Sequence, residues 1–157
     1  YQSRLYWHIR RLIVDHDLAQ DVLQDTFIKA YQNIHQFKSD SKLYTWLYRI
    51  ATNESLQQFN KMNRMKKTDE DAEYHMQNLV ADNAGKDAEE IQILLQKAIQ
   101  TLPEKQKLVF NMRYYDDLPY EEISKILDMS VGTLKTNYHY AKDKVEQYIK
   151  DNYSEEF

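Results

Sequence analysis

Seven polar side chains downstream of Ser130 recur at helical spacing, and their chemistry suits contacts with a nucleic acid. Hydroxyl and amide groups form hydrogen bonds with base edges in a DNA groove, whereas ammonium groups neutralise phosphates. The seven are Thr133, Lys135, Thr136, Asn137, His139, Tyr140 and Lys142. The spacing predicts the exposed face of a DNA-reading helix. The alternative is a plain helical hairpin whose polar face contacts only water.

The segment that precedes this face has the layout of a helix-turn-helix. Residues 120–127 predict a short helix that buries its apolar side chains, and Ser130 is placed to cap a second helix. Asp128 occupies the turn, where glycine is usual. Aspartate adopts the left-handed backbone conformation more readily than most residues, so this departure costs little.

A second candidate surface lies near the N-terminus. Asp15 or Asp17 is placed to cap a helix, and Asp21, Gln24 and Asp25 fall on adjacent turns of that helix. They form an acidic, hydrogen-bonding surface. The alternative is an ordinary solvated helix face, because exposed charges are the norm.

The loop over residues 37–42 and the helix after it form the third candidate site. The loop combines one aromatic ring with small polar side chains, a composition that can hold an unstacked base. Arg49 and Asn53 are one helical turn apart and can face the same pocket. For Tyr48, packing in the core and contact with single-stranded DNA are equally favoured by the sequence. The candidate residues are Phe37, Lys38, Ser39, Asp40, Ser41, Lys42, Tyr48, Arg49, Asn53, Lys61 and Arg64.

Helices must position all three surfaces. The chain of 157 residues contains only 2 glycines and 2 prolines, too few for the frequent turns of β-rich folds. Apolar residues recur at helical spacing through most of the chain. We therefore predict an all-α fold with helices over the following ranges: 5–14, a helix from Asp15 or Asp17 to about 34, 44–63, 88–100, 104–115, 120–127 and 131–150.

Charge divides the chain into three parts. Residues 1–67 contain 11 Lys and Arg against 6 Asp and Glu, residues 68–90 contain 1 against 8, and residues 91–157 contain 9 against 11. The acidic middle has too few large apolar residues to offset the entropy of ordering. We predict two small helical domains, residues 1–67 (the first module) and 91–157 (the second module), joined by a flexible acidic linker, 68–90.

Catalysis finds no support in the sequence. The five histidines are scattered, with no metal-binding spacing, and no glycine-rich phosphate loop is present. We predict no catalytic residues, no metal and no cofactor. Absence of cysteine fits a reducing cytoplasm, and no apolar run is long enough to span a membrane.

The three surfaces, taken in order, resemble the extracytoplasmic-function (ECF) sigma factors of bacterial RNA polymerase over nearly the full length. The stretch 21–30 resembles the family's polymerase-binding helix, 37–53 its loop and helix for opening and reading the −10 element, and 102–135 its −35-reading module. The resemblance implies a promoter-recognition and strand-opening role. It also implies that polymerase core (the beta and beta-prime subunits) and double- and single-stranded promoter DNA are partners. An anti-sigma factor or a recruiting protein is a further partner that the sequence leaves open.

Two alternatives remain at this point: a helix-turn-helix transcription regulator, and a helical protein-binding adaptor. The regulator would share the second module but would lack the polymerase-facing helix and the melting loop, so residues 21–53 discriminate against it. The adaptor would show no preference for DNA, and binding to polymerase core would distinguish a sigma factor from it. One departure from the family also matters. Asn137 and Tyr140 stand where many relatives place arginine, which predicts weaker −35 binding and a weaker salt dependence.

Overall fold

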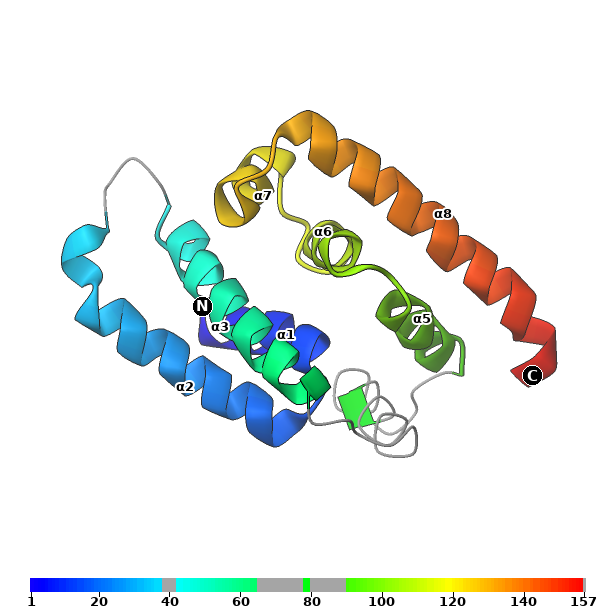
Figure 1. Ribbon diagram of the computed structural model, residues 1–157, viewed down its shortest axis with the longest axis horizontal. Helices are drawn as coiled ribbons and strands as arrows, with labels where there is room; N and C mark the ends of the chain where they lie inside the picture. Colours follow the sequence, from blue (N-terminus) through cyan, green and yellow to red (C-terminus); the bar gives the residue numbers. More distant parts are fainter. Residues whose placement is uncertain (38–41, 65–77, 80–89, 157) are drawn as a thin grey trace.

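The computed structural model (Figure 1) describes residues 1–37, 42–64, 78–79 and 90–156, and within these ranges all regular secondary structure is helical, with no strand. The elements are α1 (Gln2–Ile13), α2 (His16–Gln32), the 3-10 helix η1 (Ile34–Gln36), α3 (Leu43–Arg64), α5 (Glu90–Gln100), α6 (Glu104–Tyr114), α7 (Tyr120–Leu127) and α8 (Val131–Glu156). The prediction of an all-α fold is confirmed. Within these described ranges, no helix is both long enough and apolar enough to cross a lipid bilayer.

The start of α2 is determined by a side-chain cap. Asp15 Oδ1 accepts hydrogen bonds from the backbone N–H groups of Asp17, at 2.9 Å, and Leu18, at 3.2 Å. These bonds satisfy N–H groups that the first turn of a helix leaves unpaired. Of the two caps that the sequence allowed, Asp15 is the one used. Helix α2 ends at Gln32, and η1 lies between it and the predicted loop over residues 37–42. A single 3-10 turn is too short for a periodic pattern to detect.

The helix-turn-helix forms as its local sequence predicts. Asp128 adopts the left-handed conformation at φ 55°, and Ser130 Oγ accepts a hydrogen bond from the Thr133 N–H at 3.2 Å. The Ser124 hydroxyl closes the turn by donating to the Met129 carbonyl at 2.6 Å. After the turn, α8 continues to Glu156, beyond the predicted end near residue 150, because no glycine or proline follows Gly132 in the helix.

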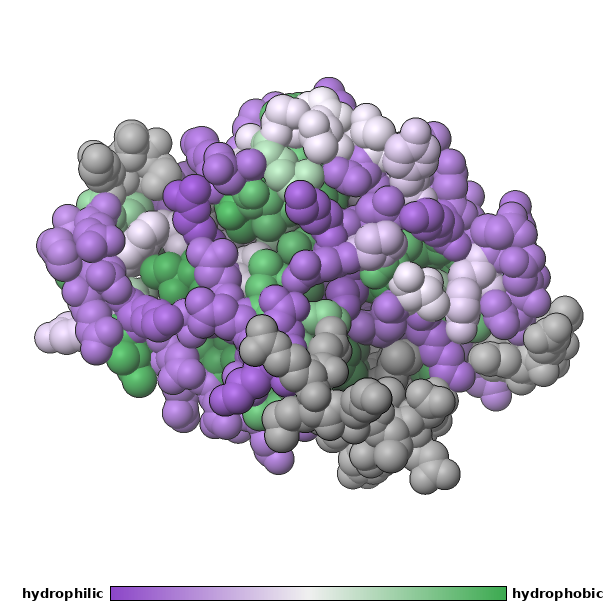
Figure 2. All heavy atoms as spheres, in the orientation of Figure 1, coloured by the Kyte–Doolittle hydropathy of each residue, from purple (hydrophilic) through white to green (hydrophobic). Residues whose placement is uncertain are grey.

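Buried side chains of the two modules form one continuous apolar cluster. Leu5, Ile9 and Tyr48 of the first module share it with Met112 and Ile123 of the second. The helices bring them together by packing α3 beside α7 and α1 beside α6 (Figure 1). The two modules therefore lie closed against each other, although the domain division itself stays a prediction. Figure 2 shows that hydrophilic groups, in purple, cover most of the visible face.

A buried lysine lies where α6 faces α3. Lys107 is 4% exposed, and its Nζ lies 4.2 Å from the ring centroid of Phe59 and 3.3 Å from Gln100 Oε1. Burial lowers the pKa of Lys107 from 10.5 to about 8, partly offset by Glu104. An ammonium group at this place is costly to keep charged, because few groups replace the water that it loses.

We expect Lys107 to contribute a rise of about 2 kcal/mol in the free energy of unfolding between pH 8 and pH 10. In this range the folded chain has released the Lys107 proton while the unfolded chain still holds it, so raising the pH favours the folded state. Urea unfolding across the range measures the rise. Above pH 10 the sign reverses, because burial raises the pKa of Tyr115 to about 12 and that of Tyr48 further.

The matched substitutions are Lys107→Met and Lys105→Met, since Lys105 is an exposed lysine two residues earlier on the same helix. Lys107→Met should abolish the rise and Lys105→Met should retain it. A rise of the same size in Lys107→Met would mean that another group causes it.

Candidate nucleic-acid interface

The face predicted to read DNA lies on α8, and six of its seven residues are exposed while Asn137 is half-buried. Helical geometry divides the seven into two stripes. Thr133, Thr136, Asn137 and Tyr140 follow the spacing i, i+3, i+4, i+7 and form one stripe, which we call the reading face. Lys135, His139 and Lys142 lie to one side of it and add positive charge where a phosphate backbone would run.

The reading face is held by the turn beneath it and by buried neighbours. The Ser130 and Thr133 hydroxyls are 2.8 Å apart, and the Thr136 hydroxyl donates to the Gly132 carbonyl at 3.1 Å. Leu134, on the opposite side of the helix, is fully buried in the cluster shared with α7. These contacts leave the first two turns of α8 protruding with their polar groups directed outward.

The acidic surface predicted on α2 is exposed in the structure and continues into apolar side chains. Asp21, Gln24 and Asp25 lie at solvent-facing positions, and Ile28 and Tyr31 follow at the same helical spacing. Ile28 is 54% and Tyr31 83% exposed. Exposed large apolar groups beside charges are typical of a protein-docking surface. Ile28 lies within the stretch 21–30 that resembles the polymerase-binding helix but was not among the predicted contact residues, and Tyr31 lies just beyond that stretch. Their spacing after Asp21 could have identified both.

A cavity of about 300 Å³ lies between the end of α2 and α3. The Trp46 ring forms part of its wall, and the Phe37 ring packs against Trp46 with the centroids 5.4 Å apart. Its polar lining consists of Lys29, Asn33, Gln36, Asn53, Glu54 and Gln57. An aromatic wall with several amides can stack a base and form hydrogen bonds with its edge.

Of the residues predicted around this cavity, the structure places some together and others elsewhere. Asn53 lines it, and Arg49 is exposed one turn earlier on α3. The prediction missed Asn33, Gln36 and Gln57, of which Gln57 was detectable at i+4 from Asn53. Lys61 is exposed at the end of α3, Arg64 is the last residue of that helix, and Lys38, Ser39, Asp40 and Ser41 lie outside the described residues.

Tyr48 lies away from the cavity and is only 1% exposed. Its ring packs against His8, with centroids 4.8 Å apart, in the contact between the modules. Burial, followed by the nearby Asp116 carboxylate, raises the pKa of its phenol. In the closed arrangement Tyr48 is a packing residue, and contact with single-stranded DNA would require the modules to separate.

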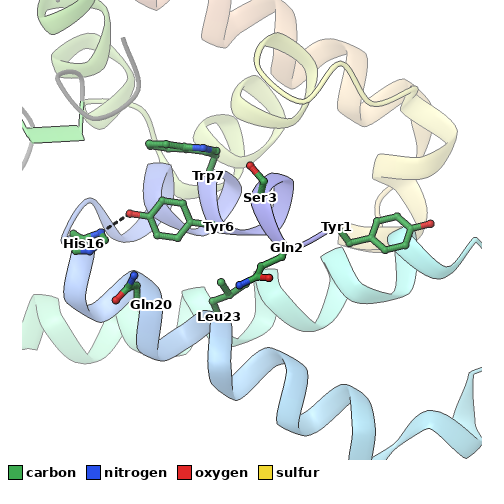
Figure 3. Close-up of a pocket in the computed structure, with 8 residues that line it drawn as sticks. All are labelled: Tyr1, Gln2, Ser3, Tyr6, Trp7, His16, Gln20 and Leu23. Carbon is green, nitrogen blue, oxygen red and sulfur yellow. Dashed lines mark hydrogen bonds between the residues drawn. The ribbon is translucent and has the colours of Figure 1, made fainter. Parts of the chain in front are cut away.

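Another hollow, of about 890 Å³, opens over α1 and α2 (Figure 3). The Tyr6 hydroxyl and His16 Nδ1 meet at its edge, 2.5 Å apart, and Trp7 contributes a ring. None of the predicted DNA-binding or polymerase-binding residues is among those that line it. The hollow lies beside the first residue of the sequence, Tyr1, and we assign it no role.

The described elements define a class: a helical protein whose second module contains a helix-turn-helix, and whose first module contains an aromatic- and amide-lined cavity and an exposed helix suited to protein docking. Family models agree with this description. The model for Sigma-70 region 2 matches residues 1–65, and the model for Sigma-70 region 4 matches residues 92–145.

Curated relatives make the assignment more specific. The RNA polymerase sigma-H factor of Pseudomonas aeruginosa is 33% identical over 163 residues, covering 96% of this chain and 82% of that protein. The ECF RNA polymerase sigma factor SigW of Bacillus subtilis is 34% identical over 168 residues, with 96% and 86% coverage. The chain belongs to the ECF family of RNA polymerase sigma factors, which act in transcription initiation.

Two solved structures share the fold. The sigma factor RpoE from Bartonella quintana, in complex with the anti-sigma factor NepR, aligns with a TM-score of 0.73 at 24% identity over 95% of this chain and 91% of that chain. CnrH, in complex with the cytosolic domain of CnrY, aligns with a TM-score of 0.72 at 17% identity over 96% and 82%. The likeness covers both modules.

Proposed function

We propose that the second module binds the −35 element through the reading face of α8. The observation that carries this proposal is the reading face itself, a stripe of hydroxyl, amide and phenol groups held outward by the helix-turn-helix. A helix of this kind fits the major groove of duplex DNA. Lys135, His139 and Lys142 would contact phosphates beside it and fix the register.

The first module would open and read the −10 element. Binding energy alone can do this, because each base that leaves the stack costs a few kcal/mol and regains it in a pocket. The cavity beside Trp46 suits one such base, with Asn53 and the neighbouring amides at its edge. Arg49 and Lys61, both exposed on α3, would contact the DNA backbone, as would Arg64 and the loop residues predicted from the sequence.

The acidic surface of α2 would dock on the core polymerase. Asp21, Gln24 and Asp25 offer charge complementarity to a basic partner surface, and the exposed Ile28 and Tyr31 supply apolar area beside it. The resemblance to the family assigns this contact to the beta-prime subunit, with further contacts to the beta subunit.

We also propose how the protein is regulated and where it acts. Both solved structures named above are complexes with a protein partner, one of them an anti-sigma factor, and a comparable anti-sigma factor would regulate this chain. The protein acts in the cytoplasm, where DNA and polymerase lie. It works by binding rather than by catalysing a reaction.

Run-off transcription tests the proposed function. Purified core polymerase and a promoter library are incubated with or without the chain. We expect promoter-specific transcripts only when the chain is present, and the sequences of the transcribed members give the promoter bases. Absence of any binding to core polymerase would overturn the assignment of the α2 surface.

We expect Tyr140→Arg to increase affinity for −35 duplex DNA about tenfold. Arginine at this exposed place on the reading face adds bidentate guanine or phosphate contacts that the natural residue cannot make. Fluorescence anisotropy at several salt concentrations measures the gain and should show a log-log salt slope steeper by about 1.

Tyr153→Arg is the matched control, because it makes the same substitution on the same helix. Tyr153 is 53% exposed, against 54% for Tyr140, but lies three turns beyond the reading face. An equal gain from both variants would mean that net charge, not position, sets the affinity. No gain from Tyr140→Arg would contradict the hypothesis that residue 140 limits −35 binding.

A further inference from the structure

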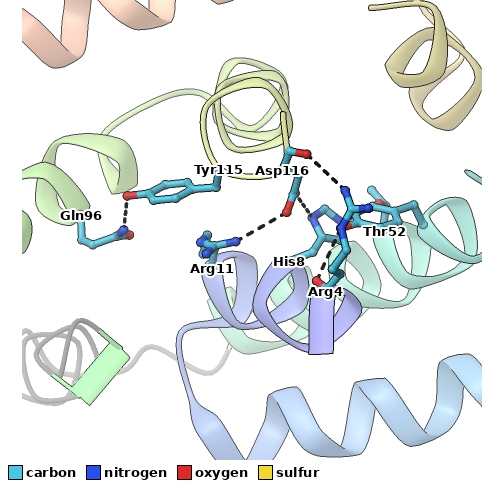
Figure 4. Close-up of polar contacts among 8 residues, drawn as sticks. Arg4, His8, Arg11, Thr52, Gln96, Tyr115 and Asp116 are labelled. Carbon is cyan, nitrogen blue, oxygen red and sulfur yellow. Dashed lines mark hydrogen bonds and ion pairs between the residues drawn. The ribbon is translucent and has the colours of Figure 1, made fainter. Parts of the chain in front are cut away.

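Two carboxylates of the second module are buried against the first module, and Asp116 is the first of them. It follows α6, and its side chain is 6% exposed. Asp116 Oδ1 lies 3.7 Å from an Arg11 guanidinium nitrogen, and Oδ2 lies 3.6 Å from His8 Nδ1 (Figure 4). Arg4 donates to the Asp116 backbone carbonyl at 3.2 Å. Three basic side chains of α1, those of Arg4, His8 and Arg11, therefore contact Asp116.

Glu122 of α7 is the second carboxylate, with a side chain that is 9% exposed. The Thr45 hydroxyl of α3 donates to Glu122 Oε2 at 2.5 Å. Lys42, the residue before that helix, has its Nζ 3.9 Å from Glu122 Oε1, and Lys125 Nζ lies 3.8 Å from the same oxygen. Glu122 therefore engages a residue predicted to contact DNA, Lys42, while α7 lies against α3.

Arg11 makes further contacts across the same boundary. Its guanidinium lies 4.2 Å from the ring centroid of Tyr115, and its backbone carbonyl accepts a hydrogen bond from Gln100 Nε2 at 3.3 Å. Burial lowers the pKa of Arg11, with Asp116 acting in the opposite direction. The Asp116 carboxylate is therefore the main compensation for a guanidinium that has lost most of its water.

Buried ion pairs of this kind stabilise the contact between the two modules only while both partners are in place. Moving a carboxylate out of water is costly, and only partners in good geometry offset the cost. For Asp116 and Glu122 those partners lie mostly on the other module, so the compensation lasts only while the modules are together. Removing one member of a buried pair leaves the other uncompensated, which favours separation.

The closed form is too short to act on a promoter, a step that rests on the proposed function. Elements named −35 and −10 are about 25 base pairs apart, or about 80 Å along B-DNA. A compact chain of this length has a radius of gyration of about 15 Å. The reading face and the cavity beside Trp46 cannot reach both elements until the modules separate.

We propose that Asp116 and Glu122 form an acidic latch, which holds the free chain closed through contacts with α1 and α3 of the first module. The closed form is the resting state of the free protein, in which Tyr48 is buried and the largely exposed Lys42 lies within ion-pair distance of the Glu122 carboxylate. Docking on core polymerase opens the latch and makes both side chains available to DNA.

The latch is tested by measuring the distance between the modules in the free, full-length chain. The protein has no cysteine, so Gln32→Cys on α2 and Glu146→Cys on α8, both exposed, provide the only labelling sites for a donor and an acceptor dye. Single-molecule energy transfer then gives the closed and open populations. We expect the unsubstituted labelled chain to be mainly closed.

The latch variant is Asp116→Asn with Glu122→Gln, and the control is Asp117→Asn with Glu121→Gln. The control removes the same number of charges from adjacent, exposed residues. We expect the closed-to-open ratio to fall at least tenfold in the latch variant and to change less than twofold in the control. The latch variant should also bind DNA more tightly than the control in the absence of polymerase.

Two results would overturn the proposal: an unsubstituted chain that is mainly open, or a latch variant as closed as the control. Far-UV circular dichroism on each variant shows whether the helices persist, and Glu122→Gln alone repeats the test if the double variant unfolds. These measurements need no polymerase. A failure of the run-off experiment with a closed free chain would therefore count against the proposed function and not against the latch.

Discussion

Asp25→Arg is expected to abolish promoter-specific transcription by weakening binding to core polymerase about 100-fold. The substitution places a cation in the middle of the exposed stripe formed by Asp21, Gln24, Ile28 and Tyr31. Reversing a charge at the centre of a docking surface costs several kcal/mol, because a basic partner surface then meets like charge. Affinity for core polymerase and the yield of run-off transcripts are the two measurements.

The control is Glu146→Arg, which makes the same change in charge at an exposed place on α8. It should leave core binding unchanged. If both variants lose binding equally, long-range charge and not the α2 surface governs the association. If neither does, α2 is an ordinary solvated helix and polymerase docks elsewhere.

Leu134→Ala is expected to lower the free energy of unfolding by about 3 kcal/mol. Leu134 has no exposed surface and anchors the first turns of α8 in the cluster shared with α7 and α3. Alanine leaves a cavity under the reading face, so binding of −35 duplex DNA should fall together with stability. Urea unfolding gives the first quantity and fluorescence anisotropy the second.

Leu134→Met serves as the control, because it conserves volume and should cost less than about 1.5 kcal/mol. Thr133→Ala, at the exposed neighbouring residue, separates the effect on DNA binding from the effect on core packing. It should weaken DNA binding with a stability change of about 1 kcal/mol or less, since the Ser130 cap remains. A Leu134→Ala variant as stable as the natural chain would contradict the packing described for α8.

The helices and the helix-turn-helix were predictable because local rules determine them. Asp15 and Ser130 cap helices through their own side chains, and Asp128 accepts a left-handed conformation, so a few neighbouring residues suffice. The exposed stripes on α2 and α8 follow from helical periodicity in the same way. Their predicted contacts with polymerase and DNA stay predictions.

The cavity beside Trp46 was predictable only in part. Asn53 was identified because it lies one turn from Arg49 on a single helix. Asn33 and Gln36 come from the end of α2 and from η1, and no pattern within α3 points to them. Their place in the cavity depends on how α2 packs against α3, which sequence spacing does not encode.

The helices, their caps, the turn before the reading face and the division of charge could all be predicted, because each depends on residues close together in the chain. The burial of Tyr48, and of Asp116 and Glu122 against α1 and α3, could not be predicted and follows from how the helices pack. The physical reason is distance along the chain: Thr45 and Glu122 are 77 residues apart. Contacts of that kind form only when the apolar surfaces of the two modules pack together. The charged groups that this packing buries must then pair with one another.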